Sequence, residues 1–339
     1  MTAATALSCP RVYVIGTGGS ISSIGDSRTD LVNYNYADRH FSIAEMVARI
    51  PEVENIADVR AEQFLNVYGG DVSPAKWLDL ARRINQIFRE DQYASGVVVT
   101  HGTSTLEETA YFLNLTVKSD KPVVVTGAMR PPTAMGTDAD MNLYDAIRVA
   151  ACPEAAGKGV LVVLNNEILA ARDAVKTSTS RLETFKSNEL GFLGYADSDG
   201  QVVFYRNPLR AHTAATEFDP ERLDRLPRVD IAYAYSGVDG VVVDALVRAG
   251  AAGLVGVGLG SGSAPRAFLN ALQAARELGV VVVIASQSFN GRVMAKRGFI
   301  ERGFVVADNL APKKARILLM LALGATRQPD DIQRMILKY

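Results

Sequence analysis

Short apolar runs alternate with amphipathic segments through most of the chain. Four runs rich in β-branched residues are typical of buried strands, and they lie at 11–15, 96–100, 122–126 and 159–164. Apolar positions at helical spacing predict helices at 42–48, 75–89, 106–115 and 141–151. Strands that alternate with helices imply βαβ units, a parallel sheet, and right-handed crossovers that place helices on both of its faces.

The pattern stops at 206–228 and then resumes. This segment is polar, rich in Pro and Arg, and contains the turn formers Asn207-Pro208 and Asp219-Pro220. Beyond it, the pattern predicts strands at 229–235, 253–258 and 280–285, and helices at 241–249, 265–278 and 312–323. We therefore predict an α/β protein with a large N-terminal α/β domain at 1–205, a linker at 206–228 and a smaller C-terminal α/β domain at 229–339.

Composition narrows the class of protein. The 339 residues suit two domains, and a hydrophobic fraction of 48% permits a large core. A net charge of −1 gives no electrostatic reason to expect nucleic acid or an acidic membrane surface as a partner. We see no signal peptide and no apolar run of bilayer length, so we expect a cytoplasmic protein, with a removed leader left open. Cys9 and Cys152 are expected to be free thiols.

A glycine-rich turn, Gly-Thr-Gly-Gly-Ser-Ile at 16–21, follows the first predicted strand. It could cradle a phosphate, but the dinucleotide fingerprint needs a third glycine where Ile21 stands and then a helix. The following segment, 22–40, is polar and aperiodic and is expected to be a loop. Two other interpretations stay open: the glycines present Thr17 to a substrate, or this is a plain tight turn with a surface hydroxyl.

A second turn, His-Gly-Thr-Ser-Thr at 101–105, lies between a predicted strand and a predicted helix. Such a position is a common place for a catalytic group, and this turn offers three hydroxyls and no carboxylate. By itself, Thr103 equally suits a cap for the helix that follows. The histidines of the chain, His40, His101 and His212, show no metal-ligand spacing.

Four ordered motifs resemble those of the bacterial-type L-asparaginase/glutaminase family. They are Thr-Gly-Gly-Ser-Ile at 17–21, His-Gly-Thr-Ser-Thr at 101–105, Lys-Pro-Val-Val-Val-Thr-Gly-Ala-Met-Arg-Pro at 121–131, and Asp-Ala-Val-Lys-Thr at 173–177 with Thr-Phe-Lys-Ser at 184–187. The resemblance covers nearly the whole chain. It implies a flavodoxin-like N-terminal domain, a smaller C-terminal α/β domain, and a homotetramer built as a dimer of dimers. It also implies active sites near the subunit interfaces, without a cofactor or metal.

The resemblance assigns roles to four residues. Thr17 matches the nucleophile, Thr103 the second catalytic threonine, and Lys176 its lysine partner; Tyr36 best matches the tyrosine of a mobile lid, with Tyr34 as the alternative. This set suits amide hydrolysis, because a threonine hydroxyl is a weak nucleophile that needs a base. A lysine partly withdrawn from water loses its proton more readily and can act through a hydroxyl.

The positions that hold the substrate depart from the family pattern. Ser104 stands where the family has an aspartate that pairs with the substrate's α-ammonium group, and Gly69 and Gly70 replace a serine and a glutamine. Asp71 is kept, and Ala128 lies in the third motif. These five residues are the predicted substrate-binding set. The two glycines would leave space for a bulkier substrate.

The sequence therefore predicts an amidohydrolase that releases ammonia from a small carboxamide, L-asparagine or a related ω-amide. The residues that match the family's catalytic positions are all present, whereas several that bind a free α-amino acid in the family are replaced. One alternative is an amidase or imidase whose substrate lacks a free α-ammonium group. An alternative of another class is a non-catalytic ligand-binding protein on the same scaffold. A dinucleotide-dependent oxidoreductase is a further alternative, which the missing third glycine disfavours.

Overall fold

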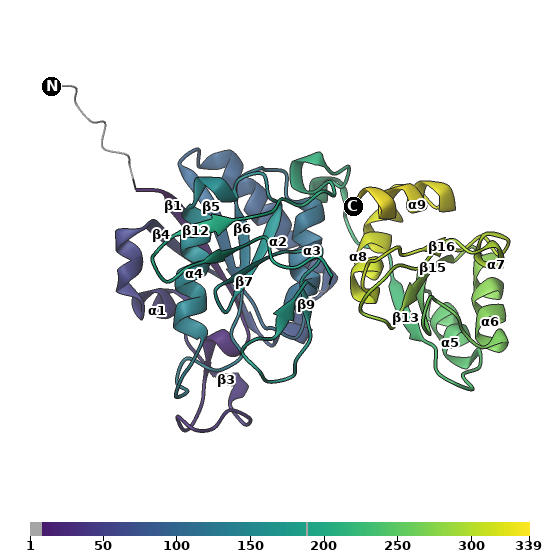
Figure 1. Cartoon of the computed structure of the whole chain (residues 1–339), viewed down its shortest axis with the longest axis horizontal. Helices are drawn as coiled ribbons and strands as arrows, with labels where there is room; N and C mark the ends of the chain where they lie inside the picture. The colour runs from purple at the N-terminus through teal and green to yellow at the C-terminus, as the bar shows by residue number, and fades with distance from the viewer. Residues whose placement is uncertain (1–8, 188) are drawn as a thin grey trace. The chain divides into compact units, whose positions relative to one another are not determined.

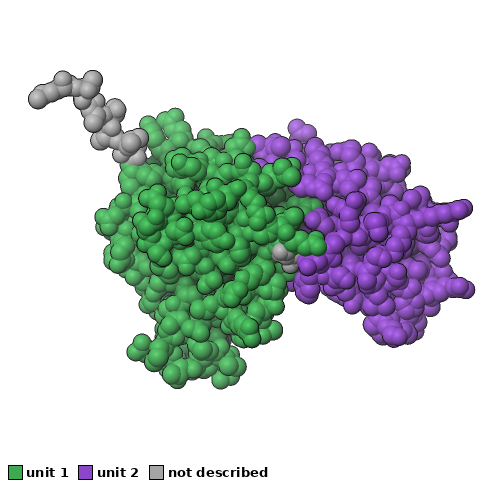
Figure 2. Space-filling model, in the orientation of Figure 1, with its two compact units in different colours: residues 1–209 green, residues 210–339 purple. Residues whose placement is uncertain are grey.

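The computed structural model describes residues 9–187 and 189–339, and at 35–38 it describes the backbone alone (Figure 1). The chain forms two compact units, residues 1–209 and 210–339 (Figure 2). The chain passes from one unit to the other between Leu209 and Arg210. The domain limits expected at 205 and 229 stay a prediction. The α/β class, with a larger sheet unit followed by a smaller one, is confirmed.

The first unit is built on an eight-stranded sheet in the order β12-β11-β8-β7-β6-β5-β1-β4. Its parallel strands are β4 (Asp58–Val67), β1 (Arg11–Gly18), β5 (Ala94–Thr100), β6 (Val123–Thr126) and β7 (Val160–Leu164). The antiparallel extension is β8 (Glu167–Ala170), β11 (Gly194–Ala196) and β12 (Val202–Phe204). The chain runs outward from β1 to β4 and then returns to β5, so the strand order reverses between β1 and β5. In open α/β sheets, ligands bind at the carboxyl ends of the strands at such a switch point.

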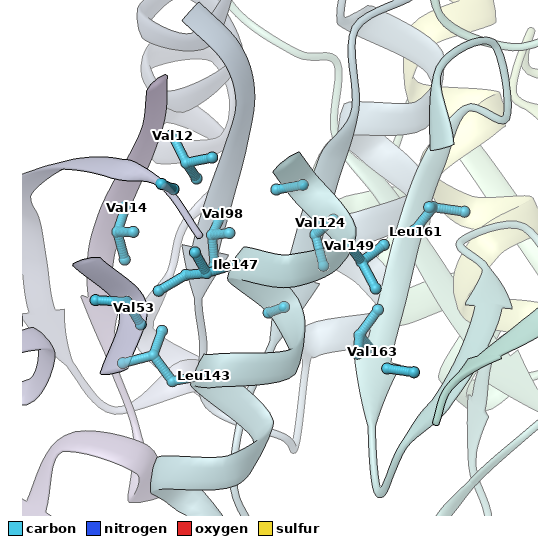
Figure 3. Close-up of a cluster of buried hydrophobic side chains, with 14 of the residues drawn as sticks. Val12, Val14, Val53, Val98, Val124, Leu143, Ile147, Val149, Leu161 and Val163 are labelled. Atoms are coloured by element: carbon cyan, nitrogen blue, oxygen red, sulfur yellow. The ribbon is translucent and has the colours of Figure 1, made fainter. Parts of the chain in front are cut away.

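Helices cover both faces of this sheet. They are α1 (Ile43–Ala48), α2 (Pro74–Glu90), α3 (Leu106–Thr116) and α4 (Ala139–Ala151). Figure 3 shows one face, where Val12, Val14 and Val98 of the strands pack with Leu143 and Ile147 of α4. Because side chains alternate along a strand, the residues between these valines face the opposite side. There α2 and α3 contact the sheet, and Trp77 stacks on Phe112 with 5.6 Å between ring centroids.

A buried ion pair joins α4 to the antiparallel strands. Arg148 Nη1 lies 2.9 Å from Asp145 Oδ1, and their side chains are 7% and 1% exposed. Arg148 also donates to the carbonyls of Asp197 and Gln201, and Asn166 donates to Asp145 Oδ2. Burial raises the pKa of Asp145 to about 6. The pair therefore fixes two hairpin turns at the far end of the sheet.

Short elements at the carboxyl side of the sheet depart from the expected loop at 22–40. The segment contains a 3-10 turn, η1 (Ser20–Ser22), and a hairpin of β2 (Ser23–Ile24) and β3 (Asn35–His40). A second hairpin pairs β9 (Val175–Lys176) with β10 (Phe185–Lys186). A further 3-10 turn, η3 (Gly69–Asp71), follows β4 at this side, whereas η2 (Pro51–Asn55) and η4 (Pro153–Ala155) precede β4 and β7 at the amino side. The strands β2 and β3 therefore pair within the segment 22–40, whose aperiodic sequence had predicted a loop.

The second unit has a parallel four-stranded sheet in the order β13-β14-β15-β16. Its strands are β13 (Val229–Tyr233), β14 (Gly253–Gly258), β15 (Val281–Ser286) and β16 (Val305–Val306). Its helices are α5 (Val241–Arg248), α6 (Arg266–Glu277), α7 (Arg297–Ile300), α8 (Pro312–Ala322) and α9 (Pro329–Lys338), with η5 (Thr213–Ala215) and η6 (Pro220–Arg222) before β13. Within the described residues, none of the helices has the length and apolarity that crossing a bilayer requires.

Candidate active site

Three glycine turns pack backbone against backbone at the carboxyl ends of β4, β1 and β5. A Cβ placed on Gly19 would lie 2.3 Å from the Cα of Gly102, and one on Gly102 would lie 2.9 Å from the Cα of Gly69. Gly19 also has a φ of 90°, in the region that favours glycine. Any side chain at these positions would push the turns apart, so the glycines hold the three strand ends together.

Thr17 lies on β1 at this junction and is 2% exposed. Its hydroxyl donates a 2.7 Å hydrogen bond to the carbonyl of Thr100, the last residue of β5. Strand β5 is therefore bound to β1 through this side chain as well as through the sheet. Gly18 and Gly19 follow with φ values of 104° and 90° and turn the chain away immediately beyond the hydroxyl.

The structure brings Thr103 and Lys176 together, although 73 positions separate them in the sequence. Lys176 Nζ lies 2.6 Å from Thr103 Oγ1, and Thr103 is 5% exposed. The backbone N–H of Lys176 donates to Glu107 Oε2 at 3.0 Å, so the buried first turn of α3 fixes β9 in place. Thr103 receives a hydrogen bond from the lysine, and the cap residue of α3 is Thr105. A lysine at this distance can exchange a proton with the hydroxyl.

A buried chain of hydrogen bonds supports the turn at 101–105. Trp77 Nε1 donates to Thr109 Oγ1 at 2.9 Å, Thr109 Oγ1 lies 2.8 Å from His101 Nε2, and His101 Nδ1 lies 2.9 Å from the Gly102 carbonyl. Burial lowers the pKa of His101 to about 4, so the ring is neutral near pH 7. We assign the proton to Nδ1, which donates to Gly102, while Nε2 accepts from Thr109. His101 therefore orients the turn that carries Thr103.

The hairpin that follows Thr17 contacts the glycine turn. Ser20 Oγ lies 3.2 Å from the hydroxyl of Tyr34. Tyr36 lies on β3, and its side chain is outside the described part of the structure. The hairpin is tied to the segment after β6, because Gly25 N–H donates to Thr133 Oγ1 at 2.9 Å. The choice between the two tyrosines stays a prediction, and only Tyr34 is seen at the turn.

The turn after β6, which contains Ala128, is held from both sides. The Asp138 carboxylate accepts hydrogen bonds from the backbone N–H groups of Met129 and Arg130, each at 2.9 Å. The side chain of Asn142 donates to the carbonyl of Gly127 at 2.9 Å. Ala128 has no exposed surface in this arrangement. Its contact with a substrate stays a prediction, and it would require the packing around this turn to open.

Gly69 and Gly70 have close neighbours at the positions where a side chain would begin. A Cβ on Gly69 would meet the Cα and carbonyl oxygen of Gly102, each at 3.1 Å. A Cβ on Gly70 would lie 2.8 Å from Cε1 of Tyr68. A side chain at residue 69 would press on the Gly102 backbone and one at residue 70 on the Tyr68 ring, whereas the space expected for a bulkier substrate stays a prediction. Sequence reasoning missed Tyr68; its only signal is an aromatic residue directly before two glycines.

The two remaining predicted substrate residues differ in their surroundings. Ser104 Oγ is buried and has no hydrogen-bond partner among the described atoms. A buried hydroxyl without a partner costs about 1–3 kcal/mol. Thr105, its neighbour, donates to the Gly69 carbonyl at 2.6 Å. Asp71, at the end of η3, is exposed. Of the three hydroxyls in the turn at 101–105, those of Thr103 and Thr105 are therefore engaged and that of Ser104 is not.

Both units match known proteins. Residues 11–210 match the N-terminal asparaginase domain, and residues 228–336 match the glutaminase/asparaginase C-terminal domain. The chain is 43% identical to L-asparaginase 2 of Bacillus subtilis (97% of this chain and 87% of the relative) and 41% identical to L-asparaginase 2 of Escherichia coli (98% and 94%). It is 40% identical to a glutaminase-asparaginase of Pseudomonas fluorescens, covering 97% and 90% of the two chains. The crystal structure of a probable cytoplasmic L-asparaginase from Campylobacter jejuni superposes with a TM-score of 0.93 at 42% identity, covering 97% of this chain and 99% of that one.

The fold, the threonine–lysine contact and these matches define an amidohydrolase enzyme. The chain belongs to the asparaginase family, as the four sequence motifs predict.

Proposed function

We propose that this enzyme hydrolyses a small carboxamide, L-asparagine or a related ω-amide, with Thr17 as nucleophile and with release of ammonia. The observation that carries the proposal is the 2.6 Å contact of Lys176 Nζ with Thr103 Oγ1 at the switch point of the sheet. The names of the relatives, L-asparaginase and glutaminase-asparaginase, agree with an amide substrate.

In the proposed reaction, the Thr17 hydroxyl attacks the amide carbon and gives up its proton. Ammonia leaves, an ester links Thr17 to the acyl group, and water hydrolyses the ester. Thr103 and Lys176 move protons in these steps, because a neutral lysine amine can accept a proton through the hydroxyl that it contacts. Backbone N–H groups of the glycine turns are suited to stabilise the oxygen that becomes negative.

The proposal extends to the lid, the assembly and the location of the protein. We propose that Tyr36, or else Tyr34, closes over the substrate on the hairpin at 22–40. The family resemblance favours a homotetramer with active sites near subunit interfaces, which light scattering at several protein concentrations would test. The match to a probable cytoplasmic L-asparaginase favours a cytoplasmic protein.

The test is ammonia release by the wild type, Thr17→Val and a matched control. Thr126→Val is that control, because Thr126 is also buried at the end of a parallel strand and donates to the Val163 carbonyl at 2.7 Å. Both variants lose one buried hydroxyl and one hydrogen bond to a carbonyl. We expect Thr17→Val to lose more than 99% of turnover and Thr126→Val to keep at least a third. If Thr17→Val keeps a tenth or more, Thr17 is not the nucleophile.

The non-catalytic alternative has its own outcome in the same experiment. A binding protein would release no ammonia from any amide in a panel of asparagine, glutamine, both D-enantiomers, succinamate, N-substituted asparagines and cyclic imides. Product binding with no turnover would favour that alternative over the enzyme.

A further inference from the structure

Tyr68 lies on the turn that contacts the candidate catalytic turn. It follows the last residue of β4, and the register pairs Val67 of β4 with Gly18 of β1, so Tyr68 lies near the level of the glycines after Thr17. The next residue, Gly69, packs against Gly102, which directly precedes Thr103. Tyr68 is 43% exposed, so the side chain offers accessible surface close to the strand ends that carry both threonines.

The ring of Tyr68 lies across Gly70. The position of a Cβ on Gly70 is 2.8 Å from Cε1 and 3.2 Å from Cδ1 of the ring, so a side chain at residue 70 would displace it. Glycine at this position therefore lets the ring lie against the backbone. An aromatic ring held in this way presents a flat apolar surface at low entropic cost.

Within the two contacting turns that the structure describes, 68–71 and 101–105, Asp71 is the one residue with a carboxylate. The Ser104 hydroxyl is buried without a partner, and a hydroxyl cannot neutralise an ammonium group. The buried carboxylate of Glu107 accepts the N–H of Lys176. Asp71 is exposed, where an ion pair is weak. An ammonium group withdrawn from water needs a carboxylate held against it, whereas an uncharged group next to an aromatic ring does not.

We propose that Tyr68 forms an uncharged aromatic wall of the substrate pocket, and that the enzyme acts on ω-carboxamides that carry an uncharged apolar group, such as an aromatic acyl cap, where asparagine carries its free α-ammonium group. This inference rests on the proposed amide hydrolysis. It assigns selectivity to Tyr68, a residue that takes no part in the proton transfers.

The first experiment compares kcat/KM for three ω-amides: L-asparagine, succinamate, which lacks the α-amino group, and N-benzoyl-L-asparagine, which carries an aromatic cap. We expect N-benzoyl-L-asparagine to exceed L-asparagine at least tenfold and succinamate to lie between them. Cleavage of asparagine tenfold or more above both other amides would overturn the proposal. If Asp71→Asn then abolished that activity, Asp71 would be the residue that supplies the charge.

Variants separate the ring from the rest of the turn. Tyr68→Ala should lower kcat/KM for N-benzoyl-L-asparagine at least tenfold and for succinamate less than threefold. Gly70→Ala should reproduce part of this loss by displacing the ring, and it should have no further effect in the Tyr68→Ala background. The matched control is Tyr93→Ala, since Tyr93 is 65% exposed and directly precedes β5, at the amino ends of the parallel strands rather than at their carboxyl ends. Equal losses on all three amides would show that Tyr68 supports the fold rather than selectivity.

Product binding distinguishes failure of this inference from failure of the proposed function. Calorimetry with N-benzoyl-L-aspartate and L-aspartate requires no turnover. Tighter binding of the benzoylated acid by at least tenfold, lost in Tyr68→Ala, supports the aromatic wall even if no tested amide is hydrolysed. Equal or weaker binding of the benzoylated acid overturns it, whatever the ammonia assay shows.

Discussion

Removal of either end of the hydrogen bond between Lys176 and Thr103 should stop the same proton transfer. Lys176→Met removes the amine and keeps the length of the side chain, and Thr103→Val removes the hydroxyl and keeps the branched shape. General acid–base catalysis contributes about 10²–10⁴-fold, so each single variant should lose about 10³-fold in kcat. If the proton passes along the 2.6 Å contact, as proposed, neither group should work without the other.

The double variant distinguishes a shared role from two separate ones. Independent losses would multiply to about 10⁶-fold, or about 8 kcal/mol at about 1.36 kcal/mol per factor of ten. A shared role would leave the double variant near 10³-fold, about 4 kcal/mol, and the coupling energy would be the remaining 4 kcal/mol or so. The kcat of the wild type, the two single variants and the double variant is measured as the initial rate of ammonia release at saturating amide.

Lys186→Met is the matched control for this cycle. Lys186 lies on β10, the strand that pairs with β9, and its Nζ bonds Glu183 at 2.6 Å. This pair is partly exposed, so its loss should cost less than about 1 kcal/mol of stability and leave turnover within threefold. Multiplicative losses for Lys176→Met and Thr103→Val would refute the relay, and an equally inactive Lys186→Met would show that β9–β10 integrity, not proton transfer, is being measured.

Four further predictions follow from particular contacts. Asp145→Asn leaves a buried arginine uncompensated and should lower the free energy of unfolding by about 3–5 kcal/mol in urea melts, whereas Asp140→Asn, in a partly exposed pair, should cost less than about 1 kcal/mol. The depressed pKa of His101 means that only the unfolded state gains its proton between pH 6.5 and 4, so stability should fall by about 3 kcal/mol over that window and fall less in His101→Asn. Ser104→Asp should raise kcat/KM on L-asparagine about tenfold to a hundredfold, and no gain would mean that another residue supplies the charge. Limited proteolysis should cut first within 22–40, and bound product should protect that segment; equal cutting with and without product would speak against a lid.

In the first unit, the strands that the sequence predicted, β1, β5, β6 and β7, are interior strands of the sheet, because continuous β-branched runs such as 96–100 belong to its middle. Strand β4 was missed because it lies at the sheet edge, where Asp58, Arg60 and Glu62 interrupt the apolar pattern. The contact between Thr103 and Lys176 was predictable only through motif resemblance. Nothing local links Thr103 to Lys176, and the pairing of β9 with β10 and the Glu107 contact set the lysine's position.

Tyr68 shows a different limit of sequence reasoning. In the sequence, Gly69 and Gly70 stand out as missing side chains, which suggests an open space. In the structure, the same absence allows two close approaches, one of the Gly102 backbone and one of the Tyr68 ring. A glycine in a sequence can indicate that another group packs closely against the backbone there, but tertiary packing determines which group it is.

The strand order β4-β1-β5 places the proposed catalytic threonines and the proposed aromatic wall on different turns. The hydroxyls of Thr17 and Thr103 belong to β1 and to the turn after β5, the two strands that flank the switch point, and Tyr68 belongs to the turn after the outer strand β4. Backbone contacts among Gly19, Gly69 and Gly102 fix the three turns without using any of these side chains. If the proposed roles hold, a substitution on the β4 turn should alter which amide fits while the two threonines keep their places, so Tyr68→Ala should change the ratio of kcat/KM between amides more than kcat itself.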